Sequence, residues 1–220
     1  MTPRLIGSIA VMGALVLSGC ASKVPETHQY SGFLDSYNDM QQTTSASGAP
    51  ILRWVDPTFD GKRYSGLIYK SIVYYPEARP SSQIGRQVLD GLLSYTDAQL
   101  KASAQKRLPL VDKPGPGVLV FRGAITAVDT SNSDLKPREL IPVALVIAGA
   151  RTATGQRPKD TNLYFEAELI DSVTNKPVVR VVRKGQGKVV TNAQQQVTVN
   201  DLKTVIDNFA ADGVMLDLMK

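Results

Sequence analysis

The stretch from Val118 to Val128 constrains the fold most strongly, because it is apolar on both of its alternating faces. Its apolar side chains are Leu119, Phe121, Ile125 and Ala127 on one side, and Val118, Val120, Ala124 and Val128 on the other. Strands of this kind are buried on both faces. The stretch therefore predicts a central strand, in which Arg122 needs a partner or a route to solvent.

Residues Asn162 to Lys184 predict a β-hairpin whose register is set by its apolar face. That face is built from alternate residues of the two strands: Leu163, Phe165, Ala167, Leu169, Val179 and Val181. A three-residue loop over residues 173–175 places Leu169 opposite Val179 and keeps the whole set on one side of the sheet. A loop of this length needs a residue in the left-handed region, for which Asn175 is suited.

Two glutamates lie on the opposite face of this hairpin, which we expect to look towards water. The predicted register puts Glu168 opposite Arg180. Strand spacing puts the carboxyl group of Glu166 roughly 6 to 7 Å from that of Glu168. Glycoside hydrolysis uses two carboxyl groups ~5 to 9.5 Å apart, so this separation is compatible with it. A face in water gives no reason for the raised acid pKa that such chemistry needs, which favours a non-catalytic surface.

Two stretches predict long amphipathic helices. Residues 84–106 carry apolar side chains at helical spacing, with Gly91 inside. A helical glycine costs ~1 kcal/mol relative to alanine, so it weakens the helix or marks close packing. Thr198 and Asp201 resemble a capping box, which begins an amphipathic helix that we expect to reach the chain end. The pattern predicts a single α+β domain with a mixed or antiparallel sheet and two long amphipathic helices on one face.

The remaining elements are shorter. We expect a short helix from Phe33 to about Gln41, a strand over Ile51–Val55 and a strand in the second half of Tyr64–Tyr75. Lys113–Gly117 is a loop, because it alternates Pro and Gly. The apolar run Ile141–Ala150 is too short to span a bilayer. It is either a buried element of the core or a patch for a partner or the membrane surface.

The amino terminus has the layout of a secretory signal. A short positive end with Arg4 precedes the uncharged, mostly apolar run Leu5–Leu17, which stops short of the ~20 residues of a spanning helix. The run ends at Leu17-Ser18-Gly19-Cys20. This sequence resembles the lipobox of bacterial lipoprotein signals. The resemblance implies that the Cys20 thiol receives a diacylglyceryl group, that the chain is cut before Cys20, and that the new amino group is acylated, for which palmitate is the expected acyl group.

The lipobox divides the chain into a signal peptide (1–19), a lipidated tether (20–30) and one periplasmic domain (31–220). Ala21, Ser22 and Lys23 follow the cysteine without an aspartate, so nothing here resembles an inner-membrane retention signal. We therefore expect the outer membrane, with the domain facing the periplasm. Cys20 is the single cysteine of the chain, so a lipidated protein would have no disulfide.

Composition excludes several classes of function. Hydrophobic residues at 43% and charged residues at 20% indicate an ordinary globular domain. The net charge of +5 comes without clustered Lys and Arg, so we expect no nucleic-acid partner. His28 is the single histidine and falls in the tether. Catalytic triads and histidine or thiolate metal sites are therefore not expected, and we predict no metal and no cofactor.

The segment Lys184–Lys188 reads as a glycine-rich basic turn. It lacks the spacing and the hydroxyl of a phosphate-binding P-loop. Four cations at this end form a candidate contact for an anion or a partner of the envelope: Arg180, Arg183, Lys184 and Lys188. The alternative is an ordinary solvated hairpin end, because exposed strand ends commonly carry Lys and Arg.

Beyond the lipobox, several segments resemble a family of proteobacterial outer-membrane lipoproteins of unknown function. They are Tyr30-Ser31-Gly32-Phe33-Leu34, Val111 to Gly117 with its Pro114-Gly115-Pro116-Gly117 end, Ala124-Ile125-Thr126, and Asp171 to Thr174. The likeness spans nearly all of the mature chain, although Asn175 stands where glycine is expected. The family implies no activity and no catalytic residues.

We therefore expect a non-catalytic binding or scaffold role in the cell envelope. The expected partners are the membrane, through the lipid anchor, and an envelope protein. The alternative is a membrane-anchored hydrolase that uses carboxylates on cell-wall glycan or lipid.

Overall fold

The computed structural model describes residues 24–81, 84–131, 159–190 and 195–212. The predicted signal peptide, Cys20 and the apolar run Ile141–Ala150 lie outside the described residues, so what we expect of them stays a prediction. Within the described part of the chain, no helix has the length and apolar character needed to cross a bilayer.

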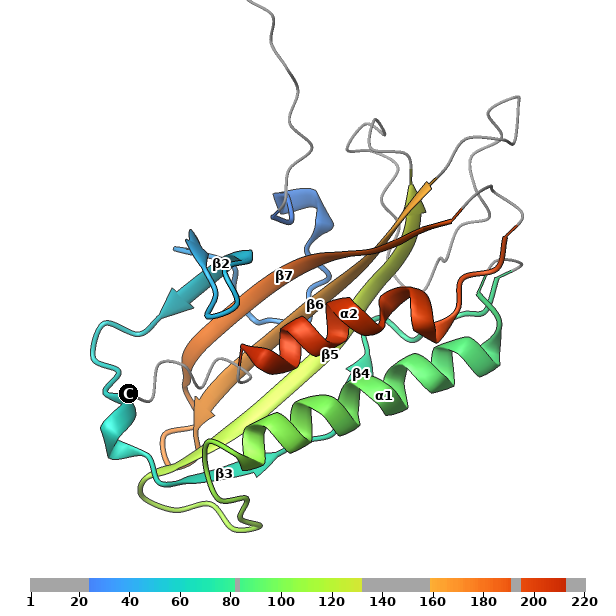
Figure 1. The fold of residues 1–220 in the computed structure, drawn as a ribbon. Helices are drawn as coiled ribbons and strands as arrows, with labels where there is room; N and C mark the ends of the chain where they lie inside the picture. The colour runs from blue at the N-terminus through green and yellow to red at the C-terminus, as the bar shows by residue number, and fades with distance from the viewer. Residues whose placement is uncertain (1–23, 82–83, 132–158, 191–194, 213–220) are drawn as a thin grey trace, which may run out of the picture.

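Seven strands of the described residues form one open, mixed sheet in the order β1-β2-β7-β6-β5-β3, with β4 also beside β5. The strands are β1 (Gln41–Thr44), β2 (Pro50–Val55), β3 (Gly66–Tyr69), β4 (Val73–Tyr74), β5 (Val118–Ser131), β6 (Lys159–Asp171) and β7 (Pro177–Val190). β3 and β4 run parallel to β5, and the other pairs are antiparallel. Helices α1 (Arg86–Gln105) and α2 (Val199–Ala211) lie together on one face (Figure 1). The predicted α+β fold is confirmed.

β5 is the interior strand that the sequence predicts. It lies between β6 on one side and β3 and β4 on the other. Its side chains Leu119, Phe121 and Ile125 are fully buried in the main core. Arg122 has the partner that its position requires, because its Nη1 lies 3.1 Å from Oε1 of Glu168 on β6.

The body of the β6–β7 hairpin has the predicted register. Glu168 pairs with Arg180 and Leu169 with Val179, as predicted, and Ala167 pairs with Val181 in the same register. Asn175 has a φ of 55°, in the left-handed region, as predicted. A register shift between Leu169 and Ile170 makes the connection longer than the three residues expected, so that β7 begins at Pro177.

Both long helices are confirmed. α2 begins with the predicted capping box, in which the Thr198 amide donates to Oδ2 of Asp201 at 2.8 Å. Gly91 marks close packing between the helices, because a Cβ there would lie 2.9 Å from Cγ2 of Val199. α2 ends at Ala211, and its predicted continuation falls on residues 213–220, outside the described part of the chain.

Three local predictions fail at positions where distant residues decide the structure. Residues 33–40 form no helix, and Gln41 begins strand β1. The single strand expected late in Tyr64–Tyr75 is two short strands, β3 and β4. Lys184–Lys188 is part of β7 rather than a turn. A Cβ on Gly185, in this segment, would lie 2.2 Å from Cγ1 of Val205, so this glycine lets α2 approach the sheet.

Candidate functional site

The sheet face opposite the helices is covered by residues 24–40, which we call the strap (Figure 1). The strap and the sheet share a small apolar cluster, whose buried members are Phe33, Leu34, Leu52, Ala124 and Val182. Val24 packs at the edge of this cluster, four positions after Cys20. Residues 24–30, which the sequence assigns to the tether, therefore begin the contact with the domain.

Glu166 of β6 lies at the centre of this interface and has no exposed surface. Its Oε1 accepts a hydrogen bond from the Ser31 amide at 2.8 Å, and its Oε2 accepts one from the Tyr37 hydroxyl at 2.6 Å. Burial raises the pKa of Glu166, and the hydrogen bonds from the strap oppose this shift only in part. A single sheet carboxyl group thus holds two points of the strap.

The Tyr37 hydroxyl organises the strap itself. It accepts hydrogen bonds from the amides of Gly32, at 2.8 Å, and Leu34, at 3.4 Å, while it donates to Glu166. The Tyr37 ring stacks on Tyr30 with 4.4 Å between ring centroids. Burial and the bond to Glu166 raise the pKa of Tyr37 to about 12, so this hydroxyl is a donor at neutral pH.

Glu168 and two arginines form the second polar contact beneath the strap. Glu168 is 1% exposed; its Oε1 meets Arg122, and its Oε2 has no hydrogen-bond partner among the described residues. Burial raises the pKa of Glu168 despite the nearby Arg122. Arg122 lies over the Phe33 ring of the strap, 5.3 Å from its centroid. Arg180 donates to the Ser36 carbonyl at 3.3 Å and lies over Trp54 of β2.

The expectation that Glu166 and Glu168 look towards water is wrong. The strap covers both, which reverses the argument that their pKa values have no reason to rise. The spacing of Phe33, Leu34 and Tyr37 predicts a helix face, whereas Phe33 and Leu34 pack on the sheet and the Tyr37 hydroxyl donates a hydrogen bond to it. The glycine at position 32 is the one signal in this segment that argues against a helix. In the structure its φ is 85°, which residues other than glycine rarely adopt.

The two buried carboxyl groups give a testable dependence of stability on pH. Because burial raises their pKa values above 4.5, the folded state binds more protons than the unfolded state above pH 4.5. Their contribution to stability is fully present below pH 4.5 and is lost as the pH rises through the folded pKa. We expect Glu166→Gln to gain unfolding free energy relative to the wild type as the pH rises from about 4.5 to about 8 in urea titrations. A constant difference across this range would contradict the prediction.

The four cations that the sequence groups as an anion contact do not converge. Arg180 contacts the strap, and Lys184 lies over Tyr164 at 5.6 Å. Arg183 points to the opposite face, where its guanidinium stacks on Phe209 of α2 at 4.4 Å. Lys188 is exposed near the end of β7. The predicted contact of these side chains with an anion or a partner stays a prediction.

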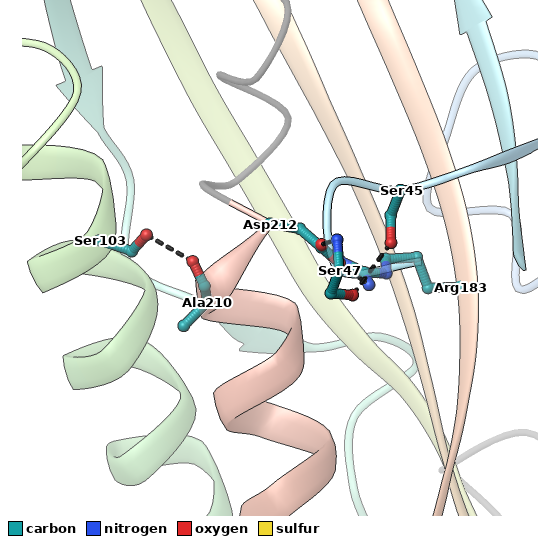
Figure 2. A network of polar contacts seen from close by, with 6 residues as sticks. All are labelled: Ser45, Ser47, Ser103, Arg183, Ala210 and Asp212. Carbon is teal, nitrogen blue, oxygen red and sulfur yellow. Dashed lines mark hydrogen bonds and ion pairs between the residues drawn. The ribbon is translucent and has the colours of Figure 1, made fainter. Parts of the chain in front are cut away.

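Arg183 instead belongs to a buried polar cluster at the C-terminal end of α2 (Figure 2). It forms an ion pair with Asp212, and the two residues are 6% and 3% exposed. Asp212 Oδ1 also accepts the amide of Ser47 from the β1–β2 turn. The Ser103 hydroxyl of α1 donates to the Ala210 carbonyl of α2. This cluster ties one end of α2 to β7, to the β1–β2 turn and to α1.

The described residues contain no group of three or more His, Cys, Asp and Glu side chains that could hold a metal ion. A shallow groove lies where α1 meets the first turn of α2, beside Gly91 and Tyr95. No carboxylate or imidazole lines this groove: its residues are Gln87, Val88, Gly91, Ser94, Tyr95, Thr198, Val199, Asn200 and Lys203. The strap interface, in contrast, holds the two buried carboxyl groups of Glu166 and Glu168.

Comparisons with solved structures find distant similarities. A PelC dodecamer from Paraburkholderia phytofirmans matches with a TM-score of 0.35 and 10% identity, over 74% of this chain and 95% of that chain. A putative neuraminyllactose-binding hemagglutinin homolog from Helicobacter pylori matches with a TM-score of 0.34 and 9% identity, over 80% and 90%. These values are too low to support a functional argument.

Sequence comparisons give a firmer result. The protein "Uncharacterized lipoprotein YdcL" of Escherichia coli K12 is 51% identical over 211 residues, which cover 96% of this chain and 95% of that protein. The family described as "Protein of unknown function (DUF3313)" matches residues 29–213, from the strap to the end of α2. This chain therefore belongs to the DUF3313 family of proteins of unknown function.

Proposed function

We propose that this protein is a lipoprotein of the outer membrane, anchored through Cys20 and facing the periplasm, with a non-catalytic binding or scaffold role in the cell envelope. The lipobox and the name of the E. coli relative support the anchor. The absence of aspartate after Cys20 supports the outer membrane. Two acyl chains or more make such an attachment effectively permanent.

One observation favours the non-catalytic role over a carboxylate-dependent hydrolase. Glu166 and Glu168 are 0% and 1% exposed beneath the strap, and Glu166 uses both oxygens to hold it. A substrate cannot approach within hydrogen-bonding distance of these groups while the strap is in place. The pKa of Glu166 is raised by burial in this contact, and release of the strap would solvate the carboxyl group and remove that cause. Glu166 is therefore not a general acid that is both open to a substrate and raised in pKa.

Cys20→Ala tests the anchor. We expect this variant to lose incorporation of labelled palmitate and to accumulate as an uncleaved precursor, because the thiol that receives the lipid is gone. Ser18→Ala is the matched control, because alanine keeps the small residue that the lipobox requires. Normal processing of Cys20→Ala, with recovery in the outer-membrane fraction of a density gradient, would contradict the anchor.

Crosslinking in intact cells tests the scaffold role. The wild type should crosslink reproducibly to an envelope protein, and Cys20→Ala should lose that product because it lacks the lipid that anchors the protein in the outer membrane. In parallel, purified protein with Glu166→Gln and Glu168→Gln should match the wild type in assays on cell-wall glycan and lipid. Loss of a measured hydrolytic activity in these variants, with the fold intact, would support the hydrolase instead.

A further inference from the structure

The strap is attached to the sheet differently from the rest of the fold. The main core lies between the sheet and the two helices, whereas the strap places Phe33 and Leu34 in a separate, smaller cluster, with partly buried side chains packed at its edge. Satellite clusters of this kind lie under segments that open more easily than the core. The strap is therefore a distinct structural layer with its own stability.

Side chains of the sheet make the hydrogen bonds that hold residues 29–37 of the strap. Four such bonds join this part to the described sheet, and the sheet partner is a side chain in each: Tyr164 for Gln29, Glu166 for Ser31 and Tyr37, and Arg180 for Ser36. These bonds are not the cooperative backbone ladder that joins neighbouring strands. Loss of one of these sheet side chains therefore removes a large share of the hydrogen bonds that attach the strap to the sheet.

Charged groups beneath the strap favour its opening. Glu166 and Glu168 are buried there, and burial raises the pKa of both. Glu168 Oε2 has no hydrogen-bond partner among the described residues, and neither has Arg180 Nε. Buried charges with incomplete partners are unfavourable, and exposure to water would solvate them. Opening of the strap would therefore expose these groups to water.

We propose that the strap is a releasable latch that sets how far the domain reaches from its lipid anchor. The inference rests on the proposed lipidation of Cys20. With the strap closed, the chain from Cys20 to Val24 limits the separation of anchor and domain to about 14 Å, at ~3.5 Å per residue. With the strap released, the chain from Cys20 to Gln41 allows about 70 Å. The closed domain stays at the membrane surface, and the released domain reaches partners deeper in the envelope.

Hydrogen exchange of the mature protein tests the latch itself. Tyr37→Phe removes the hydroxyl that bonds Gly32, Leu34 and Glu166, and we expect about tenfold faster exchange of the Ser31 and Gly32 amides, with the β6 amides unchanged. Phe33→Ala should act in the same direction through the loss of apolar contact. Tyr64→Phe is the matched control, because it removes a tyrosine–carboxylate bond of 2.9 Å to Asp171, away from the strap. Equal exchange of the strap in Tyr37→Phe and in the wild type would overturn the proposal.

Energy transfer in vesicles tests the reach. The lipidated Cys20 offers no free thiol, so Val173→Cys, in the exposed hairpin turn, gives one site for a fluorescent donor. Transfer to acceptor lipids should fall in the Tyr37→Phe background and stay unchanged in the Tyr64→Phe background. If the strap amides exchanged faster in Tyr37→Phe while energy transfer to the lipids did not fall, the proposed increase in distance between domain and membrane would be contradicted. If the wild type carried no lipid, the proposed function would fail, while the exchange measurement would still decide whether the strap opens.

Discussion

Replacing Arg183 with methionine is expected to lower the unfolding free energy by about 3 to 5 kcal/mol, because it leaves the carboxylate of Asp212 buried without its cation. The pair lies between β7 and the end of α2, where Asp212 is 3% exposed. Methionine keeps much of the packing against Phe209, so the variant isolates the charge. Urea unfolding followed by circular dichroism measures the effect.

A second change at Asp212 provides the control. Arg183→Met combined with Asp212→Asn removes both charges and keeps an oxygen acceptor for the Ser47 amide. This double variant should recover most of the loss, because neutral partners have a smaller desolvation cost. Lys203→Met, at an exposed position of α2, should change stability by no more than about 0.5 kcal/mol. If Arg183→Met were as mild as Lys203→Met, the ion pair would not hold α2 on the sheet.

Gly185→Ala is expected to destabilise the protein by about 1 to 3 kcal/mol through overpacking. The new Cβ would lie 2.2 Å from Cγ1 of Val205 and 3.1 Å from Cε1 of Phe209, so α2 would have to move away from β7. The movement would also disturb the ion pair at the end of α2. Thermal unfolding measures the loss, which should amount to several degrees.

Val205→Ala in the same chain should relieve part of this cost, because it removes the methyl group that the new Cβ meets. Gly115→Ala is the matched control: its Cβ would have no atom within 4 Å, and we expect a change within about 0.5 kcal/mol. If Gly185→Ala matched Gly115→Ala in stability, α2 would not be packed on β7 as closely as the structure has it.

The helices and strands that could be predicted from the sequence are those whose formation depends on residues close together in the chain. The apolar alternation of Val118–Val128 is sufficient to define an interior strand. The register of the hairpin follows from its own apolar face and from Asn175, because both strands and the turn lie within one short segment. The start of α2 follows from Thr198 and Asp201, which are three residues apart.

The strap could not be predicted in this way. Ser31 and Tyr37 contact Glu166 at sequence separations of 135 and 129 residues. The spacing of apolar residues within a short segment does not indicate contacts between residues so far apart. The same limit applies to Gly185, which in isolation favours a turn and in the fold is the place where α2 approaches the sheet. The sequence showed that the even-numbered face of β6 carried two glutamates, but it did not show that another segment covers them.

The order of strands in the sheet has a consequence for how the domain forms during export. β2 pairs with β7, as Leu52 does with Val182, so an early strand is completed only by a late one. Contacts so far apart in the chain have a large loop-closure entropy and slow the folding of a domain. In the proposed lipoprotein, the anchored end of the chain emerges first, together with the strap, β1 and β2. These segments have no sheet to join until β7 arrives, so we expect folding to follow translocation of nearly the whole chain.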